Sequence, residues 1–207
     1  MVANWVPWSA ASLVSGAVLL VLGVLTLPLG DDVTELMAAL PANGPRWLMG
    51  ASALILASLG LTLGMPVIAW LLGAKSRAAL AGLWVWSMGT IGLAALGTMV
   101  LVLETVDSVV ALDAQQAATL LSDPSLAYFA YVVVGCFLLG ELVVALSLAR
   151  ARVVDGWVPG LLVAHVLSTP LVMTWPMALS GVHAVALGVA VMGIASRATE
   201  AWSGQPA

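Results

Sequence analysis

The sequence predicts an all-α fold, with residues 1–207 forming a single transmembrane domain built as a bundle of about six membrane-spanning helices. Composition is the first reason: 62% of the residues are hydrophobic, only 8% are charged and the mean hydropathy is +1.13. The second reason is that each apolar run has about the 20 residues that a helix needs to cross a bilayer. These runs cover residues 9–29, 46–73, 79–104, 126–149, 157–174 and 177–196.

The first apolar run is expected to remain in the protein as a helix. No basic residue precedes it, and no small-x-small cleavage signal follows it near Pro28. In the later runs, small residues mark positions where helices can approach closely. These residues are Gly60, Gly64, Gly89, Gly92, Gly181 and Gly188.

Two prolines lie inside predicted helices. Pro66 and Pro170 each lack a backbone donor, which frees the carbonyl groups of Thr62 and Val166, so kinks are expected there. Ordinary transmembrane prolines and gating hinges both fit this pattern, and the former is favoured because such helices tolerate proline.

Charge predicts the orientation. Arg46 is the only basic residue assigned to one face, whereas the loops after the second and fourth runs and the C-terminal tail hold the other five: Lys75, Arg77, Arg150, Arg152 and Arg197. Basic residues are enriched in cytoplasmic loops. We therefore expect a multi-pass protein of the cell membrane with both termini in the cytoplasm.

The two long outer loops resemble each other. Residues 31–40 and 107–121 each open with an aspartate and then carry spaced apolar residues, which predicts two short surface helices. The loops begin about 76 residues apart, so the first four helices form a weak repeat of two hairpins, and the last two helices form a third hairpin. Asp31, Asp32 and Glu35 are interpreted as helix-capping residues, with a weak cation site as the alternative.

Several function classes are excluded. The net charge is −4 and the basic residues are scattered, so nucleic-acid binding is not expected. Cys136 is the only cysteine, which rules out an internal disulfide or a cysteine metal cluster. No catalytic signature, cofactor motif or metal-ligating pattern is present, and no cofactor is predicted.

Glu141 is the residue most indicative of function, because it lies inside the fourth apolar run about eight residues from its cytoplasmic end. A buried carboxylate in a membrane must be neutralised, paired or hydrated. His165 lies at the same depth in the next helix, and His183 is also near mid-membrane. Either Glu141 and His165 form an acid–base pair in a polar pocket that also contains His183, or Glu141 is hydrogen-bonded only to stabilise the bundle.

Other candidate binding residues lie in the third run. Glu104 and Asp107 share a helical face and form either the mouth of a substrate path or a solvated helix end at which Asp107 caps the next helix. Trp84 and Trp86 face different directions, so one is expected to line a pocket and the other to meet lipid. A haem held by His165 and His183 is disfavoured because neighbouring helices leave little room for a porphyrin.

Two stretches carry a resemblance. Residues 137–157, which read FLLGELVVALSLARARVVDGW, and residues 59–66, which read LGLTLGMP, resemble uncharacterised multi-pass membrane proteins of high-GC actinobacteria. The resemblance implies a membrane topology and no particular activity. The chain departs from that group at Glu141, where a small or apolar residue is usual.

Three functions remain open. The leading hypothesis is a bundle that binds a small lipophilic molecule, as a membrane-embedded acid–base cyclase or isomerase with Glu141 and His165 as its catalytic residues. The second is a small proton-coupled transporter or exporter working as an oligomer. The third is an accessory subunit whose glycine-rich faces bind partner helices. The expected partners are the lipid bilayer, a lipophilic ligand, and further copies of the chain or another membrane protein.

Overall fold

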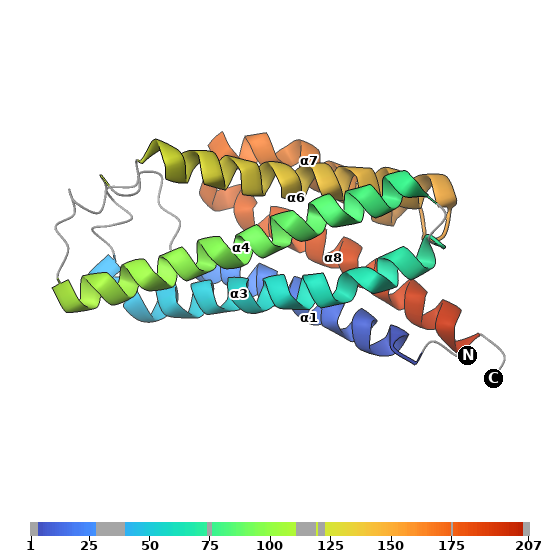
Figure 1. The fold of residues 1–207 in the computed structure, drawn as a ribbon, viewed down its shortest axis with the longest axis horizontal. Helices are drawn as coiled ribbons and strands as arrows, with labels where there is room; N and C mark the ends of the chain where they lie inside the picture. Colours follow the sequence, from blue (N-terminus) through green and yellow to red (C-terminus); the bar gives the residue numbers. More distant parts are fainter. Residues whose placement is uncertain are drawn as a thin grey trace.

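A computed structural model describes residues 4–27, 40–73, 76–110, 119, 123–174 and 176–204. Over these residues the fold is all-helical (Figure 1). The helices are α1 (Val6–Thr26), α3 (Leu40–Leu71), α4 (Arg77–Val110), α6 (Pro124–Ala151), α7 (Trp157–Thr174) and α8 (Pro176–Ser203). All six predicted helices are confirmed.

Five helices are long and apolar enough to cross a membrane within the described ranges. They are Val6–Thr26, Gly44–Leu71, Arg77–Val106, Pro124–Ala151 and Gly181–Ser203. This arrangement is consistent with an integral membrane protein. α7 is not among the five, and the crossing of the membrane by six helices stays a prediction.

Two helices run several residues past their predicted ends. α4 continues from 104 to Val110 and α8 from 196 to Ser203. Apolar runs stop at the first polar residues, but a helix continues until a breaker interrupts it, and neither extension contains glycine or proline. Asp107 therefore lies inside α4, and the prediction that it caps a separate surface helix is wrong. Most of the two predicted surface helices, with Asp31, Asp32 and Glu35, lies outside the described residues.

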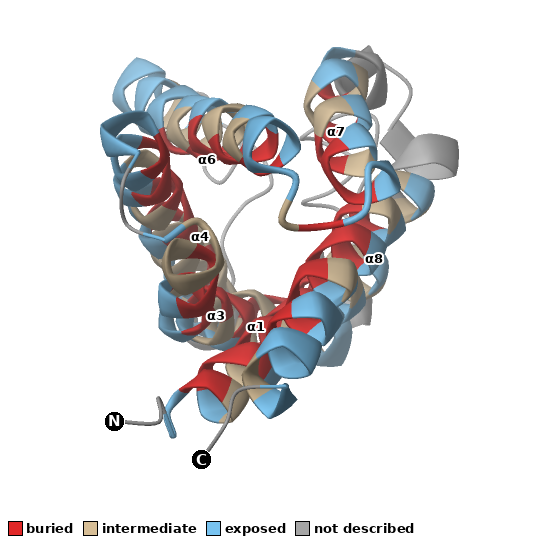
Figure 2. Ribbon diagram, turned by 90° about the vertical axis from the view of Figure 1, so that its right-hand side faces the viewer, coloured by how far each residue is buried: buried red, intermediate tan, exposed pale blue. Residues whose placement is uncertain are grey.

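The helices form a ring in chain order. Each helix contacts the next one along the chain, and α8 returns to contact α1. Seen end-on, α4 and α6 form one arm, α7 and α8 form the other, and α1 and α3 lie where the arms meet (Figure 2). The ring thus brings α6 and α7 together on the side opposite α1.

Glycines allow the closest contacts. A Cβ atom added to Gly16 would lie 2.4 Å from the backbone nitrogen of Leu61, and one added to Gly89 would lie 2.4 Å from that of Phe137. The predicted close approaches are confirmed for all six glycines. The glycines of α3 and α8 among them face α1, and those of α4 face α6. The glycine faces are therefore occupied by helices of the same chain.

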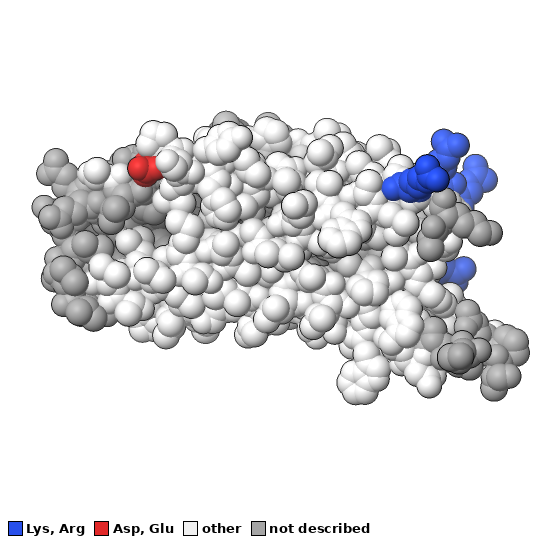
Figure 3. Space-filling model, in the orientation of Figure 1, with Lys and Arg blue, Asp and Glu red and all other residues white. Residues whose placement is uncertain are grey.

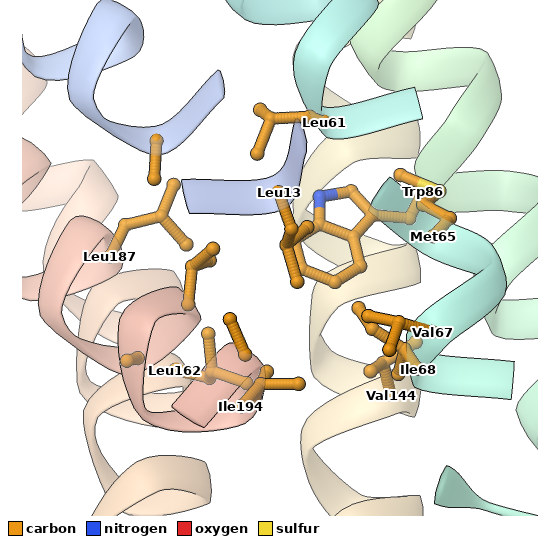
Figure 4. Packing of buried hydrophobic residues seen from close by; sticks show 14 of the residues in the cluster. Leu13, Leu61, Met65, Val67, Ile68, Trp86, Val144, Leu162, Leu187 and Ile194 are labelled. Carbon is orange, nitrogen blue, oxygen red and sulfur yellow. The ribbon is translucent and has the colours of Figure 1, made fainter. Parts of the chain in front are cut away.

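The core draws on all six helices. Leu13, Leu61, Trp86, Val144, Leu162 and Leu187, one from each helix in chain order, belong to one buried cluster (Figure 4). The outer surface is also apolar, since Trp84, Leu63 and Leu167 are largely exposed. Exposed apolar surface of this extent suits contact with lipid.

Charged side chains lie at the ends of the bundle. Figure 3 shows Arg side chains at one end of the visible face and an acidic side chain near the other. Arg77 begins α4, Arg150 lies in the last turn of α6 and Arg197 lies near the end of α8. This clustering agrees with the predicted distribution, while the cytoplasmic assignment of that end stays a prediction.

Candidate functional site

Glu141 lies on the buried stripe of α6. Phe137, Glu141, Val144 and Leu148 recur every three or four residues and all point into the bundle. Because Glu141 occupies a position of this stripe, its side chain is fully buried, with 0% of its surface exposed. Helical spacing thus places a carboxyl group in an apolar core.

His165 of α7 binds Glu141 directly. His165 Nδ1 and Glu141 Oε2 are 2.8 Å apart, and the two side chains are 6% and 0% exposed. The short turn between α6 and α7, where Arg152 adopts a left-handed conformation with φ of 53°, sets the two helices side by side. The hydrogen bond can form in two ways. Either a protonated Glu141 donates to neutral Nδ1 of His165, or Nδ1–H of His165 donates to the Glu141 carboxylate.

His183 of α8 stacks on His165. Their ring centroids are 3.9 Å apart and the rings are inclined by 20°. Ser168 Oγ lies 2.9 Å from His183 Nδ1, and Thr169 Oγ1 lies 3.3 Å from His183 Nε2. A hydroxyl group donates or accepts, so this pair fits His183 in either tautomer or protonated.

The same two hydroxyl groups also bind the carbonyl oxygen of His165. Ser168 Oγ and Thr169 Oγ1 donate to it at 3.1 and 3.0 Å, and a hydroxyl that does so can still accept from an N–H group of His183. They follow His165 by three and four residues, so one turn of α7 carries the whole arrangement. Sequence reasoning missed Ser168 and Thr169, although two hydroxyl residues one turn after a histidine in an apolar run were a usable signal.

Aromatic rings extend the site towards α4. Phe137 contacts Trp86 with ring centroids 6.0 Å apart and His165 with centroids 6.4 Å apart, both edge to face. Trp86 is 0% exposed. Trp86 Nε1 and Glu141 Oε1 are both buried and have no hydrogen-bond partner among the described residues. The site therefore contains one free donor and one free acceptor.

The remaining predicted binding residues lie elsewhere. Trp84 is 74% exposed and faces outward, so the structure does not place it in the site. Glu104 is half-buried and lies 18 residues beyond Trp86 in α4, about 27 Å along the helix axis. Asp107 follows Glu104 by three residues, and its side chain is outside the described part. Glu141, His165, His183 and Trp86 are the predicted residues that the fold brings together.

The stacked histidines do not suit haem. Two axial ligands direct ring nitrogens at an iron between them, whereas His165 and His183 present their faces to each other. Within the described ranges, no group of three His, Cys, Asp or Glu residues is arranged to hold a metal ion. The arrangement is suited to proton exchange through the hydrogen bond between Glu141 and His165.

Comparison with known proteins gives no assignment. No protein-family model matches the chain, and neither a curated protein nor a solved structure matches it. The resemblance to actinobacterial membrane proteins therefore stays a prediction.

Proposed function

We propose that this chain is a multi-pass membrane protein that binds a small lipophilic molecule within its helix bundle and exchanges a proton with it through Glu141 and His165. The observation that carries the proposal is the fully buried carboxyl group of Glu141, with Oε2 bound to His165 Nδ1 at 2.8 Å and Oε1 unpartnered. Ionisable groups inside membrane domains are costly, and they typically mark functional sites.

The unpartnered oxygen separates this proposal from a purely stabilising role. A carboxyl group that only stabilises a bundle is expected to satisfy both oxygens, because a buried unpaired polar atom costs about 1–3 kcal/mol. Glu141 satisfies one oxygen within the described part of the chain and leaves the other free. The free oxygen is available to a bound molecule.

The chemistry that such a pair supports is an acid–base isomerisation or cyclisation. Glu141 gives a proton to one atom of the bound molecule, and the pair takes a proton back from another, so no net proton is consumed. His165 holds Glu141 in place and shares its proton. The rings of Phe137 and Trp86 beside the pair stabilise positive charge that develops on an apolar molecule.

Proton-coupled transport is the second candidate, and His183 favours it. His183 is only partly buried, whereas Glu141 is fully buried and His165 is nearly so. His183 stacks on His165 and has two hydroxyl partners, so it can take up a proton from the surroundings beside the buried pair. Uptake or efflux that depends on a proton gradient and is lost in Glu141→Gln supports transport over catalysis.

The accessory-subunit hypothesis draws less support from the geometry. The glycine-rich faces that this hypothesis assigns to partner helices pack against helices of the same chain, as Gly60 does against Gly16. Glu141 binds His165 of the same chain and is closed to a partner's basic residue. A partner would therefore have to bind the apolar outer surface.

Infrared difference spectroscopy in lipid nanodiscs tests the proposal. The wild type and Glu141→Gln are titrated with and without a total lipid extract of the host cells. We expect a carboxyl band that is absent from Glu141→Gln, titrates with pH and shifts when extract is added. Glu200→Gln is the control, since Glu200 lies exposed near the end of α8. A wild-type band that does not shift with the extract, together with a Glu141→Gln variant that loses only thermal stability, contradicts the proposal.

A further inference from the structure

We infer that the molecule bound in the bundle is a lipophilic alcohol, whose hydroxyl group lies between Glu141 Oε1 and Trp86 Nε1. The inference rests on the proposed function and specifies its ligand. Four buried side-chain polar atoms lack a partner in the described part of the chain, and two of them, Glu141 Oε1 and Trp86 Nε1, come from facing turns of α6 and α4.

The backbone contact between α4 and α6 fixes these two residues at one level. A Cβ atom added to Gly140 would lie 2.2 Å from the backbone nitrogen of Trp86 and 2.5 Å from its Cα. Glu141 directly follows Gly140. Both side chains also flank Phe137, whose ring contacts the Trp86 ring and lies one helical turn before Glu141. The residues that carry the free donor and the free acceptor therefore lie at one level on facing helices.

The surroundings give neither atom another partner. The indole ring of Trp86 lies in the core near Leu13, Leu61 and Met65 (Figure 4). Leu13 and Leu61 offer no acceptor for an N–H group, and the Met65 sulfur accepts a hydrogen bond from Ser87 Oγ. A buried donor and a buried acceptor without partners are uncommon in folded proteins, which points to a molecule that binds both.

The hydrogen-bonding capacity of the two atoms selects the ligand. Indole N–H only donates, and Oε1 accepts while the proton lies between Oε2 and His165. The ligand group must accept from Trp86 and donate to Glu141, and a neutral hydroxyl does both through one oxygen. A carboxylate only accepts and an ammonium only donates, and each would add a charge to an apolar core. The apolar residues around the site require that the rest of the molecule is hydrocarbon.

Spectroscopy of both atoms in the same sample tests this inference. Protein labelled with ¹⁵N in its indole groups is placed in nanodiscs and titrated with three probes: a straight-chain alcohol, an isoprenoid alcohol and a sterol, each paired with its parent hydrocarbon. The Trp86 signal is the one missing from Trp86→Phe. At least one alcohol is expected to shift both the Trp86 signal and the Glu141 carboxyl band saturably, while its hydrocarbon shifts neither.

Variants sharpen the test. Trp86→Phe is expected to weaken alcohol binding about tenfold, the loss typical of one hydrogen bond. Trp84→Phe is the matched control, because Trp84 lies in the same helix and faces outward. If Trp86→Phe fails to fold, the Trp86 signal is assigned by its absence from Trp86→Tyr, and the shifts in the wild-type protein decide the question.

Two outcomes overturn the inference. In the first, no alcohol shifts both signals, or the hydrocarbons shift them equally. In the second, the Trp86 signal reports a hydrogen bond before any alcohol is added and no alcohol displaces it, which identifies water at this position. Either result leaves the proposed function standing if the Glu141 band still titrates and responds to the host extract.

Discussion

Trp86 of α4 and Gly140 of α6 pack backbone against backbone. A Cβ atom added to Gly140 would lie 2.2 Å from the Trp86 nitrogen, closer than real Cβ contacts allow. The contact positions α4 against α6 one residue before Glu141. Glycine at this position is therefore part of what holds the carboxyl group and the indole ring beside each other.

Gly140→Ala is expected to lower the free energy of unfolding by about 1–3 kcal/mol, the usual cost of inserting a methyl group into a packed contact. The clash is with backbone, so a rotamer change does not relieve it. Gly135→Ala is the matched control, since a Cβ atom there meets nothing within 4 Å and alanine favours a helix. Equal unfolding midpoints for both variants in a detergent titration would show that α4 and α6 are not closely packed here.

The bond between Glu141 and His165 predicts an order of stabilities. Glu141→Leu leaves His165 Nδ1 without its hydrogen-bond partner and is expected to cost about 1–3 kcal/mol. Glu141→Gln retains an acceptor oxygen, and its cost is expected to be about 1 kcal/mol or less, as for other hydrogen bonds between membrane helices.

Glu200→Gln controls for the loss of a carboxylate. Glu200 pairs with Arg197 at 3.1 Å, but its side chain is 63% exposed, and solvent screening keeps the expected change within about 0.5 kcal/mol. Unfolding measured in mixed micelles checks all three variants. Glu141→Leu as stable as the wild type would show that this bond does not stabilise the fold.

Hydropathy was sufficient to predict the helices and part of the site. Counting residues at about 1.5 Å each from the turn between α6 and α7 places Glu141 and His165 at one depth, and the structure joins them by a hydrogen bond. Depth depends only on the length of each apolar run, so it can be read from sequence.

Rotation of a helix about its axis could not be predicted in the same way. A membrane helix is apolar towards lipid and towards its neighbours, so its sequence carries little sign of which face is inside. Trp84 and Trp86 lie about 200° apart on α4, so one was expected inside the bundle and the other outside. The angle does not say which of the two tryptophans is inside. The stacking of His165 on His183 also depends on rotation and was beyond sequence reasoning.

Asp123 predicts a pH dependence at the start of α6. Its Oδ1 accepts a hydrogen bond from the backbone N–H of Ser125 at 2.7 Å, and this bond, with one from the Ser125 side chain, lowers the pKa of Asp123 below its ordinary value of 3.8. A lowered pKa in the folded state adds stability above pH 3.8, and this stability is lost as the pH falls through the folded value.

Asp123→Ala is therefore expected to have a slightly lower thermal midpoint than the wild type at neutral pH, and the difference should shrink in acid. Asp123→Asn retains a capping oxygen but no charge, so at neutral pH its midpoint should lie between those of Asp123→Ala and the wild type. A difference between Asp123→Ala and the wild type that is constant down to the lowest pH would show that the charge of Asp123 has no part in the cap.

Topology is the remaining prediction, and single cysteines test it. In a Cys136→Ala background, Ser76→Cys reports the end of the bundle with Arg77, and Ser125→Cys reports the opposite end of α4 and α6. Both positions are exposed. Because basic residues favour the cytoplasm, an impermeant maleimide should label Ser125→Cys in intact cells and Ser76→Cys only after permeabilisation. The reverse pattern would invert the orientation.

Two more positions decide whether α7 crosses the membrane. Asp155→Cys lies between α6 and α7, and Gly204→Cys follows α8; both positions are exposed. If α7 and α8 both cross, the two cysteines are labelled under the same condition as Ser76→Cys. If α8 crosses and α7 does not, Gly204→Cys is labelled under the same condition as Ser125→Cys instead. Because His165 lies in α7, labelling of Gly204→Cys together with Ser125→Cys would remove the membrane-buried acid–base pair on which the proposed function depends.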